Sequence, residues 1–368
     1  MTGIETITNL FLEYFDSLGY PVISDPDTPN LIKSYSNIDD EIYALFKGVG
    51  VRNISHEGII ELSGKDAMDF LHRITTNSLK DVAKGSLVDT IFTTEKGRII
   101  DVASILNFED HQLLLCSFHN KGKVMSWISK YVLTDDVKLS DAAGKYTVLQ
   151  VIGPQADSFI TLLAGEIVNK TERDSFKIAI VEGMMFFLVK RIGEDGHNNF
   201  IIITEAGNGL GIVKYMQNNK GPFDFKMVGE DAYNLYRVEH GIPAAPNELN
   251  DLYNPYEVEL INLVNFKKGC YIGQEVIARL DAFDKVQRKL KRITIEKMVD
   301  KNEEYTLFDE NDKNVGKITS LAYSKKSDKL LGLAYVRKAY SEEGTKLIIR
   351  NSHNNSVEVI VHNLKSKK

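Results

Sequence analysis

The stretch NFKKGCYIGQEVIARL, residues 265–280, carries the most specific signal in this chain. It places Cys270, one of only two cysteines, in a glycine-bracketed turn just after Lys267 and Lys268. Glycines allow the backbone to bend sharply or to approach a ligand closely, and the apolar spacing after Gly273 predicts a helix. A helix start and two ammonium groups favour the thiolate form of a nearby cysteine. From these residues alone, a reactive thiol and a tight turn with an incidental cysteine are equally open.

The cysteine count limits the chemistry of this turn. Cys116 lies in the apolar run LLLCSF and is expected to be a buried core thiol. Structural zinc and iron–sulfur clusters normally need four ligands, so Cys270 could not hold either by itself, and we expect no metal site. Two cysteines are also too few for a disulfide framework, which predicts reduced thiols and a cytoplasmic location.

Length and composition indicate an ordinary soluble protein of two or three domains. The chain has 368 residues, of which 43% are hydrophobic and 26% charged. The formal net charge of -6 predicts no general attraction to nucleic acid or to an anionic membrane. No targeting segment and no run long enough for a transmembrane helix is expected.

Hydrophobic periodicity divides the chain into three regions with different predicted secondary structure. Residues 4–18 and 65–74 predict helices, and residues 98–108 and 111–118 predict a hairpin of two strands. A second unit is expected to begin near Tyr146, with a strand-helix-strand-strand-helix order that favours a small, ferredoxin-like α+β layer. After about Arg288, short strand-like runs separated by turn residues predict an all-β domain.

Two acidic positions stand out among these elements. Asp101 interrupts the apolar strand that follows the glycine turn EKGR, so its carboxylate is expected either on a solvated face or in a paired, functional position. Glu194 lies with Asp195 in the glycine-bracketed turn GEDG, where solvated turn residues are the default expectation.

Together these segments resemble a known family. The motif NFKKGCYIGQEVIAR is similar to the signature of the YgfZ-type folate-binding proteins, the iron–sulfur maintenance branch of the GcvT aminomethyltransferase superfamily. The segments EKGRIIDVASIL, TVLQVIGPQADSFI and YRVEHGIPAAPNEL resemble further parts of that superfamily. The resemblance therefore covers most of the chain.

The resemblance implies an α+β fold of three domains around a central folate-binding opening. It implies a discontinuous first domain, to which the cysteine motif returns, and a C-terminal antiparallel β-barrel. The boundaries expected from it are 1–145 plus 226–287 for the first domain, 146–225 for the second and 288–368 for the barrel.

The resemblance also implies a tetrahydrofolate site and its residues. Asp101 matches the acidic position that faces the pterin, Glu194 falls in a turn lining the same pocket, and Arg237 falls in the arginine segment near the folate. Asn120 fits an asparagine expected after the hairpin. The residues implied to shape the loop around the functional thiol, Cys270, are Lys268, Gly269, Tyr271, Gly273, Gln274 and Glu275.

The function implied is support of iron–sulfur cluster assembly or repair in client proteins, with tetrahydrofolate as the cofactor and no classical enzymatic turnover. One alternative is a folate-dependent aminomethyltransferase of the glycine-cleavage type. Against it, Val102 follows Asp101 where aminomethyltransferases carry a second aspartate. Further alternatives are a tRNA-modification factor, which the charge balance and the missing phosphate-binding loop disfavour, and a folded relic that binds nothing.

Overall fold

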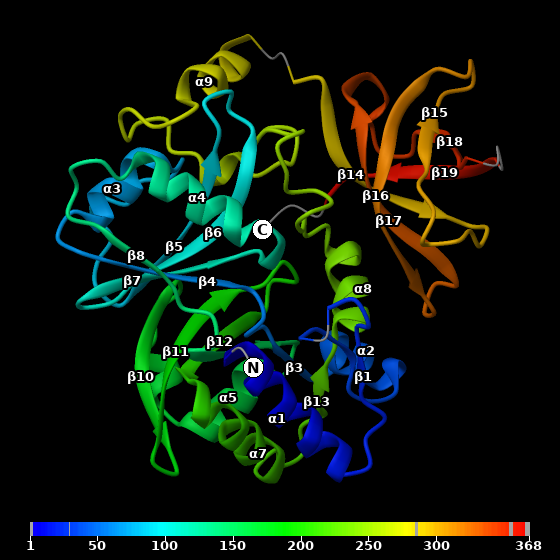
Figure 1. Ribbon diagram of the computed structural model, residues 1–368. Coiled ribbons are helices and arrows are strands. Elements are labelled where there is room, and N and C mark those ends of the chain that lie inside the picture. Colours follow the sequence, from blue (N-terminus) through cyan, green and yellow to red (C-terminus); the bar gives the residue numbers. More distant parts are fainter. Residues whose placement is uncertain (1–2, 29, 284–285, 353–355, 365–368) are drawn as a thin grey trace.

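The computed structural model describes residues 3–28, 30–283, 286–352 and 356–364. Over this part, a mixed α/β body carries a separate all-β lobe at the C-terminal end (Figure 1). No helix in the described ranges combines the length and apolar character needed to cross a membrane. The α+β class and the C-terminal barrel predicted from the sequence are confirmed.

The body is built on one sheet of eleven strands in the order β13-β3-β9-β12-β11-β10-β5-β6-β7-β4-β8. Only the β13–β3 pairing is parallel, and the other pairings are antiparallel. The strands are β3 (Val49–Asn53), β4 (Gly58–Ser63), β5 (Ser86–Thr93), β6 (Ile99–Asn107), β7 (His111–Cys116), β8 (Lys138–Asp141), β9 (Tyr146–Ile152), β10 (Ser175–Val181), β11 (Met184–Ile192), β12 (Asn198–Glu205) and β13 (Phe225–Val228). A two-stranded ribbon of β1 (Ile23–Ser24) and β2 (Ile32–Ser34) lies outside this sheet.

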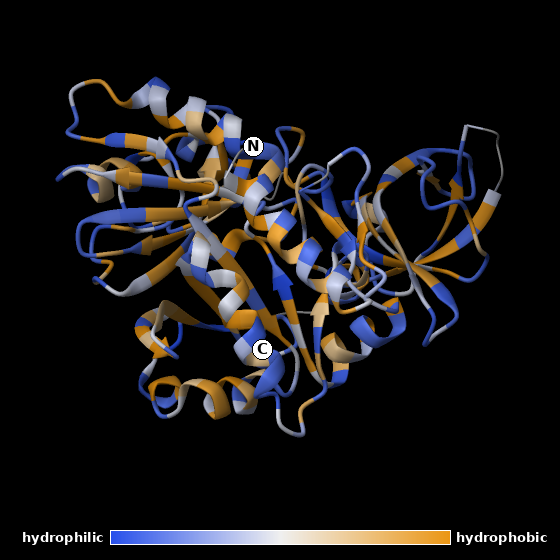
Figure 2. Cartoon of the chain, turned by 60° about the horizontal axis from the view of Figure 1, so that its bottom comes forward, coloured by the Kyte–Doolittle hydropathy of each residue, from blue (hydrophilic) through white to orange (hydrophobic). Residues whose placement is uncertain are grey.

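The predicted hairpin is confirmed as β6 and β7, joined by a tight turn and paired from Ser104↔Leu115 to Asn107↔Gln112. Apolar side chains fill both faces of these strands, because the sheet is covered on both sides. Figure 2 shows long hydrophobic stretches along the strands of the large sheet and mixed hydrophobic and hydrophilic positions along its helices. Asp101 is thus a buried carboxylate in a largely apolar strand, as the sequence indicated.

Helices cover the sheet, and most bury one apolar stripe against it. The two predicted N-terminal helices are confirmed as α1 and α3. Helix α1 ends just before Gly19, which has a left-handed backbone conformation (φ +77°). The helices of the body are α1 (Gly3–Ser17), α2 (Ile38–Lys47), α3 (Ala67–Ile74), α4 (Lys121–Tyr131), α5 (Ala156–Ala164), α6 (Ile167–Lys170), α7 (Gly209–Asn218), α8 (Glu230–His240) and α9 (Gln274–Phe283), with short 3₁₀ turns η1 (Phe118–Asn120), η2 (Ala206–Asn208) and η3 (Ile261–Leu263).

The hydrophobic cores of the body combine residues from distant parts of the chain. Phe11 and Phe15 of α1 share one core with Val51 of β3, Phe159 of α5 and Phe225 of β13. A second core lies under α3 and α4, and a third surrounds the segment 249–277. The middle unit also contains one strand more than the sequence predicted, because β10 precedes the β11–β12 pair. The predicted domain boundaries stay a prediction, and residues 365–368 of the third lie outside the described residues.

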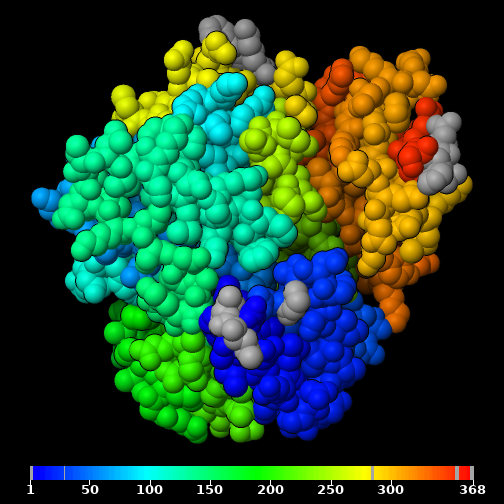
Figure 3. Space-filling model, in the orientation of Figure 1, coloured from blue at the N-terminus to red at the C-terminus, as the bar shows by residue number. Residues whose placement is uncertain are grey.

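The C-terminal lobe is a closed antiparallel barrel in the order β14-β17-β16-β15-β18-β19. Figure 3 shows it at one side of the molecule, in contact with the body. Its strands are β14 (Arg288–Ile295), β15 (Thr306–Phe308), β16 (Asn314–Ser324), β17 (Lys329–Arg337), β18 (Lys346–Arg350) and β19 (Ser356–His362), and η4 (Lys338–Tyr340) follows β17. The rings of Tyr253 in the body and Tyr335 in the barrel stack with centroids 3.4 Å apart, which ties the lobes together.

Candidate functional site

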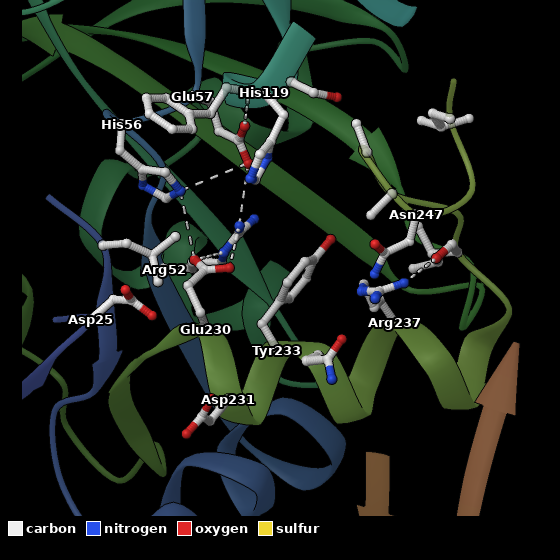
Figure 4. A pocket seen from close by; sticks show the side chains of 18 of the residues that line it. Asp25, Arg52, His56, Glu57, His119, Glu230, Asp231, Tyr233, Arg237 and Asn247 are labelled. Carbon is white, nitrogen blue, oxygen red and sulfur yellow. Dashed lines mark hydrogen bonds and ion pairs between the residues drawn. The ribbon is translucent and has the colours of Figure 1, made fainter. Parts of the chain in front are cut away.

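A cavity of about 600 Å³ lies where the body meets the segment after α8. Five parts of the chain form its wall: the β1–β2 region, the end of β3 with residues 56–57, residues 117–119 at the η1 turn, one face of α8 and the loop 242–249 (Figure 4). The volume falls within the range of about 300–1,000 Å³ that holds drug-sized ligands. The cavity is therefore the candidate functional site.

An ion pair between the buried Arg52 and the half-buried Glu230 forms one side of this cavity. Arg52 Nε lies 2.6 Å from Glu230 Oε1, its NH2 group lies 2.7 Å from Glu230 Oε2, and its guanidinium stacks 4.0 Å from the centroid of the Tyr233 ring. Burial disfavours the ionised form of Glu230, but Arg52 outweighs burial and holds the pKa of this carboxyl below its usual value. This bidentate geometry fixes the positions of both charged groups.

Glu57 and His56 extend this polar wall toward η1. The Phe118 backbone N–H donates to Glu57 Oε2 (2.8 Å), and Arg52 NH2 lies 3.4 Å from Glu57 Oε1. His56 Nε2 lies 3.9 Å from Glu57 Oε1 and 4.0 Å from Glu230 Oε1. The wall thus offers carboxylate acceptors, an imidazole and a guanidinium to one ligand.

Asp101 lies one hydrogen bond behind the cavity wall. It is fully buried, and it accepts hydrogen bonds from the Ser117 backbone N–H (2.7 Å), the Ser117 hydroxyl (2.9 Å) and Asn120 Nδ2 (3.3 Å). Burial raises the pKa of Asp101 to about 6, although these donors oppose the rise. Ser117 lines the cavity and Asp101 does not, so any influence of this carboxyl on a ligand passes through Ser117 in this conformation.

The structure brings Asn120 together with Asp101. Its amide bridges the Asp101 carboxylate and the backbone oxygen of Leu249 (3.1 Å), a residue that lines the cavity. Asn120 is almost fully buried, and its two hydrogen bonds connect β6 to the loop 242–249.

Arg237 lines the opposite side of the cavity and is already paired. Its NH1 group lies 3.2 Å from Glu248 Oε2, and its NH2 group donates to the Ser320 hydroxyl (2.7 Å) in β16. The Ser320 hydroxyl in turn donates to Glu248 Oε1 (2.7 Å). Arg237 therefore joins α8, the 242–249 loop and the barrel, and a ligand carboxylate would share its charge with Glu248.

Glu194 is not among the residues that line this cavity in the described part of the chain. It is half-buried in the β11–β12 turn, where its charge helps to raise the pKa of Arg191. The neighbouring Asp195 Oδ2 accepts a hydrogen bond from the Tyr236 hydroxyl (2.9 Å) of α8. A folate contact of Glu194 stays a prediction, as do those of Asp101, Asn120 and Arg237.

Cys270 is exposed at the apex of a loop and does not line the cavity. Lys268 anchors the loop to the segment after α3, because its Nζ donates to the backbone oxygens of Thr75 (2.6 Å) and Asn77. Burial lowers the pKa of Lys268 to about 7. His72 adds a second contact, because its Nδ1 accepts from the Leu79 N–H, which leaves Nε2 to donate to the Lys268 oxygen (3.1 Å).

The remaining motif residues complete this loop. Tyr271 is buried, and burial raises its pKa to about 12. Gln274 begins α9, and Glu275 is exposed in its first turn. Gly269 and Gly273 have φ values of +98° and +86°, which favour glycine. A functional role for Cys270 and its loop stays a prediction.

The two motif glycines give a matched test of this loop. A Cβ on Gly273 would lie 2.6 Å from the Thr94 oxygen, whereas one on Gly269 would meet nothing within 4 Å. We expect Gly269→Ala to cost about 1 kcal/mol of unfolding free energy, from backbone strain alone, and Gly273→Ala to cost at least about 3 kcal/mol. Denaturant unfolding measures both values, and equal losses would contradict this account of the loop.

The charged wall of the cavity was not predicted from the sequence. Arg52, His56 and Glu57 lie in and just after β3, whereas Glu230, the partner of Arg52, lies 178 residues further along the chain in α8. The available signal was an arginine inside the apolar run VGVRN. A buried arginine requires a carboxylate partner, but the sequence does not say which one.

Comparisons with known proteins agree with this architecture. Residues 24–268 match the family model described as the GCVT N-terminal domain, and residues 288–365 match the glycine cleavage T-protein C-terminal barrel domain. A crystal structure of the glycine cleavage system aminomethyltransferase T from Bartonella henselae superposes with a TM-score of 0.82 over 96% of each chain, at 18% identity. That structure supports the fold alone.

Two relatives illustrate the range of similar proteins. A chloroplastic Arabidopsis thaliana protein named as a transferase is 26% identical over 92% of this chain and 76% of its own length. An aminomethyltransferase of Thermotoga maritima is 27% identical over 83% of each chain. Because the N-terminal family model alone spans well over half of the residues, the chain belongs to the GcvT family, the superfamily of the aminomethyltransferases.

Proposed function

We propose that this protein binds tetrahydrofolate in the 600 Å³ cavity and takes part in folate-dependent one-carbon transfer, in the manner of aminomethyltransferases. The observation that carries the proposal is the set of paired charges along this cavity in a chain of the GcvT family. Relatives named as aminomethyltransferases support the transfer step. We further propose a cytoplasmic location, which two cysteines without a disulfide favour.

The residues present fit such a ligand. A pterin offers adjacent N–H groups, from which the carboxylates of Glu57 and Glu230 can accept hydrogen bonds. Lys33, Arg52 and Arg237 offer cations for the carboxylates at the other end of a folate, although each is already paired with an acidic side chain. The site therefore suits a ligand that has both donors and carboxylates, and gives no excess attraction to a simple anion.

Asp101 is the residue best placed for proton transfer next to the cavity. A carboxyl with a pKa of about 6 changes its protonation state near neutral pH, and the Ser117 hydroxyl connects it to the cavity wall. Bound tetrahydrofolate would supply the nitrogen atoms that accept the one-carbon unit. The protein's part is to orient that ligand, to exclude water and to hold or release the proton at Asp101.

Calorimetry with tetrahydrofolate tests the binding proposal. Ala244 lines the cavity, whereas Ala278 is exposed on α9 away from its lining. We expect Ala244→Phe to weaken binding at least tenfold by filling the cavity, and Ala278→Phe to leave it unchanged. Absence of binding to the unmodified protein, or equal effects of the two variants, would contradict the proposed site.

A separate assay tests transfer. Tetrahydrofolate-dependent release of ammonia from an aminomethylated lipoyl carrier is expected with the unmodified protein and not with the Ala244→Phe variant. Binding without ammonia release would leave the folate site standing and would contradict aminomethyl transfer.

A second candidate function, support of iron–sulfur cluster assembly or repair in client proteins, rests on Cys270. The motif KGCYIGQE and the exposed thiol on a loop held by Lys268 and His72 favour it. In cells under oxidative stress, we expect Cys270→Ala to reduce the activity of client cluster enzymes at least severalfold. The neighbouring Lys267→Ala variant, also exposed, is the control, and unchanged client activity with Cys270→Ala would contradict this candidate.

A further inference from the structure

One edge of the large sheet is open along β10. On one side, β10 pairs with β11 from Ser175↔Lys190 to Val181↔Met184. On its other side it pairs with β5 only at Ser175↔Ser86. Within the described part of the chain, no strand pairs with residues 177–181 on that side. In Figure 1 this strand lies at the outer margin of the body.

The open edge carries large apolar side chains. Ile178 is 52% exposed and Ile180 is 66% exposed, and both point to the same face because side chains alternate along a strand. Met185, which is 45% exposed, lies opposite Ile180 in β11. An exposed edge with an apolar face is a template for pairing with another strand.

The backbone direction of this edge follows from its short contact with β5. The Phe176 N–H donates to the Gly85 oxygen (2.7 Å), and the Asp174 oxygen accepts from the Leu87 N–H (2.7 Å). Because backbone groups of a strand alternate with a period of two, the N–H and C=O groups of Ile178 and Ile180 point to the same side. They are the donors and acceptors that the open edge offers.

We propose that two copies of this chain associate through antiparallel pairing of their β10 strands, centred on Ala179. In this register Ile178 of one copy lies opposite Ile180 of the other. Both members of each pair present outward N–H and C=O groups, so the two pairs form four hydrogen bonds between the chains. The exposed isoleucines of the two copies also meet on one face.

The sequence of the strand favours a second copy over an unrelated segment. A shift by one residue would place Ile178 opposite Ala179, whose backbone groups point toward β11, so the hydrogen bonds would be lost. The single charged side chain of the open stretch, Lys177, lies opposite Val181, which keeps the two lysines at least about 13 Å apart along the strands. The strand is thus complementary to itself about a two-fold axis.

Sedimentation equilibrium at 10–500 µM, a range chosen because so short an interface should be weak, tests the association. We expect a monomer–dimer equilibrium for the unmodified protein and at least tenfold weaker association for Ile178→Lys/Ile180→Lys. The control is Ile23→Lys/Leu133→Lys, which adds the same charge at two other exposed apolar positions and should leave the association unchanged. A monomer throughout the range, or equal loss in the control, would overturn the proposal.

Cysteine cross-linking tests the register. In a Cys270→Ser background, Ile178→Cys and Ile180→Cys chains are oxidised separately and as an equal mixture. Opposed residues of a hydrogen-bonded pair lie about 5.5 Å apart between Cα atoms, which a disulfide can bridge, whereas two copies of residue 178 lie roughly 8 Å apart. We expect cross-linked dimer only in the mixture. Cross-linking of either variant alone, or none in the mixture, would overturn the proposed pairing.

Discussion

Asp101→Asn is expected to change the pH dependence of stability. The pKa of Asp101 is about 6 in the folded chain, above the value of about 4 for an unfolded aspartate. Folding therefore favours the protonated form, and the ionised form is disfavoured. The stability contributed by the protonated carboxyl is fully present below pH 4 and is lost as the pH rises through 6. The total change is about 3 kcal/mol.

The asparagine variant lacks this titration and can keep most of the local contacts. Its oxygen can accept from the Ser117 N–H, and its amide can donate to the Ser117 hydroxyl, so only the longer bond from Asn120 is lost. We compare the free energy of unfolding of Asp101→Asn with that of the unmodified protein at each pH. From pH 4 to pH 8, we expect this difference to shift by about 3 kcal/mol in favour of the variant. Denaturant unfolding at several pH values measures this difference.

The matched control is Asp81→Asn, which removes the same charge from an exposed position. Parallel curves for Asp101→Asn and the unmodified protein would contradict the raised pKa. If Asp101 handles a proton in transfer, the same variant should also lower the transfer rate about 100-fold while tetrahydrofolate affinity changes little. A loss of affinity with an unchanged rate would assign Asp101 to binding instead.

Glu248→Ala is expected to cost about 3–5 kcal/mol of unfolding free energy. Glu248 is fully buried and accepts from Arg237 NH1, the Ser320 hydroxyl and the Ala244 N–H (3.0 Å). Its removal leaves the buried Arg237 guanidinium without a counter-charge. The loss should appear in chemical denaturation monitored by tyrosine and tryptophan fluorescence, and as earlier proteolysis between body and barrel, because Ser320 belongs to β16.

A double variant separates the charge from the packing. Arg237→Met/Glu248→Leu removes both charges and keeps much of the side-chain volume, so we expect it to cost less than Glu248→Ala alone. Lys317→Ala, in the same strand as Ser320, removes an exposed ion pair with Glu304 and should cost less than about 1 kcal/mol. A loss of that small size for Glu248→Ala would mean that the pair does not hold the barrel to the body.

Much of the local structure could be predicted because its signals lie within short windows. The β6–β7 hairpin, helices α1 and α3 and the all-β character after Arg288 follow from periodicity and turn residues. The proximity of Asp101 to Asn120 was also within reach, because the two residues lie on one hairpin and the turn that follows it. The motif around Cys270 indicated the superfamily through its resemblance to a family signature, and its two glycines adopt conformations that other residues disfavour.

The cavity could not be predicted in the same way. Its wall joins residues 25–33, 52–57, 117–119 and 230–249, which are brought together by sheet pairing and by the docking of α8. The partner of Arg52 is Glu230, one of many acidic residues in the chain, and no spacing rule selects it. β10 was missed as well, and its open edge is a property of which strands become neighbours, not of its own residues.

The sequence by itself determined the all-β C-terminal domain and the turn around Cys270, because turn glycines and hydrophobic alternation act over a few residues, and its resemblance to a known family indicated the superfamily. Only the tertiary structure decided that Asp101 lies behind Ser117, that Arg237 is neutralised by Glu248 and that Cys270 lies outside the cavity lining. Burial and charge pairing depend on distances between segments that are far apart along the chain. They set the pKa values and the accessibility on which the proposed folate chemistry depends.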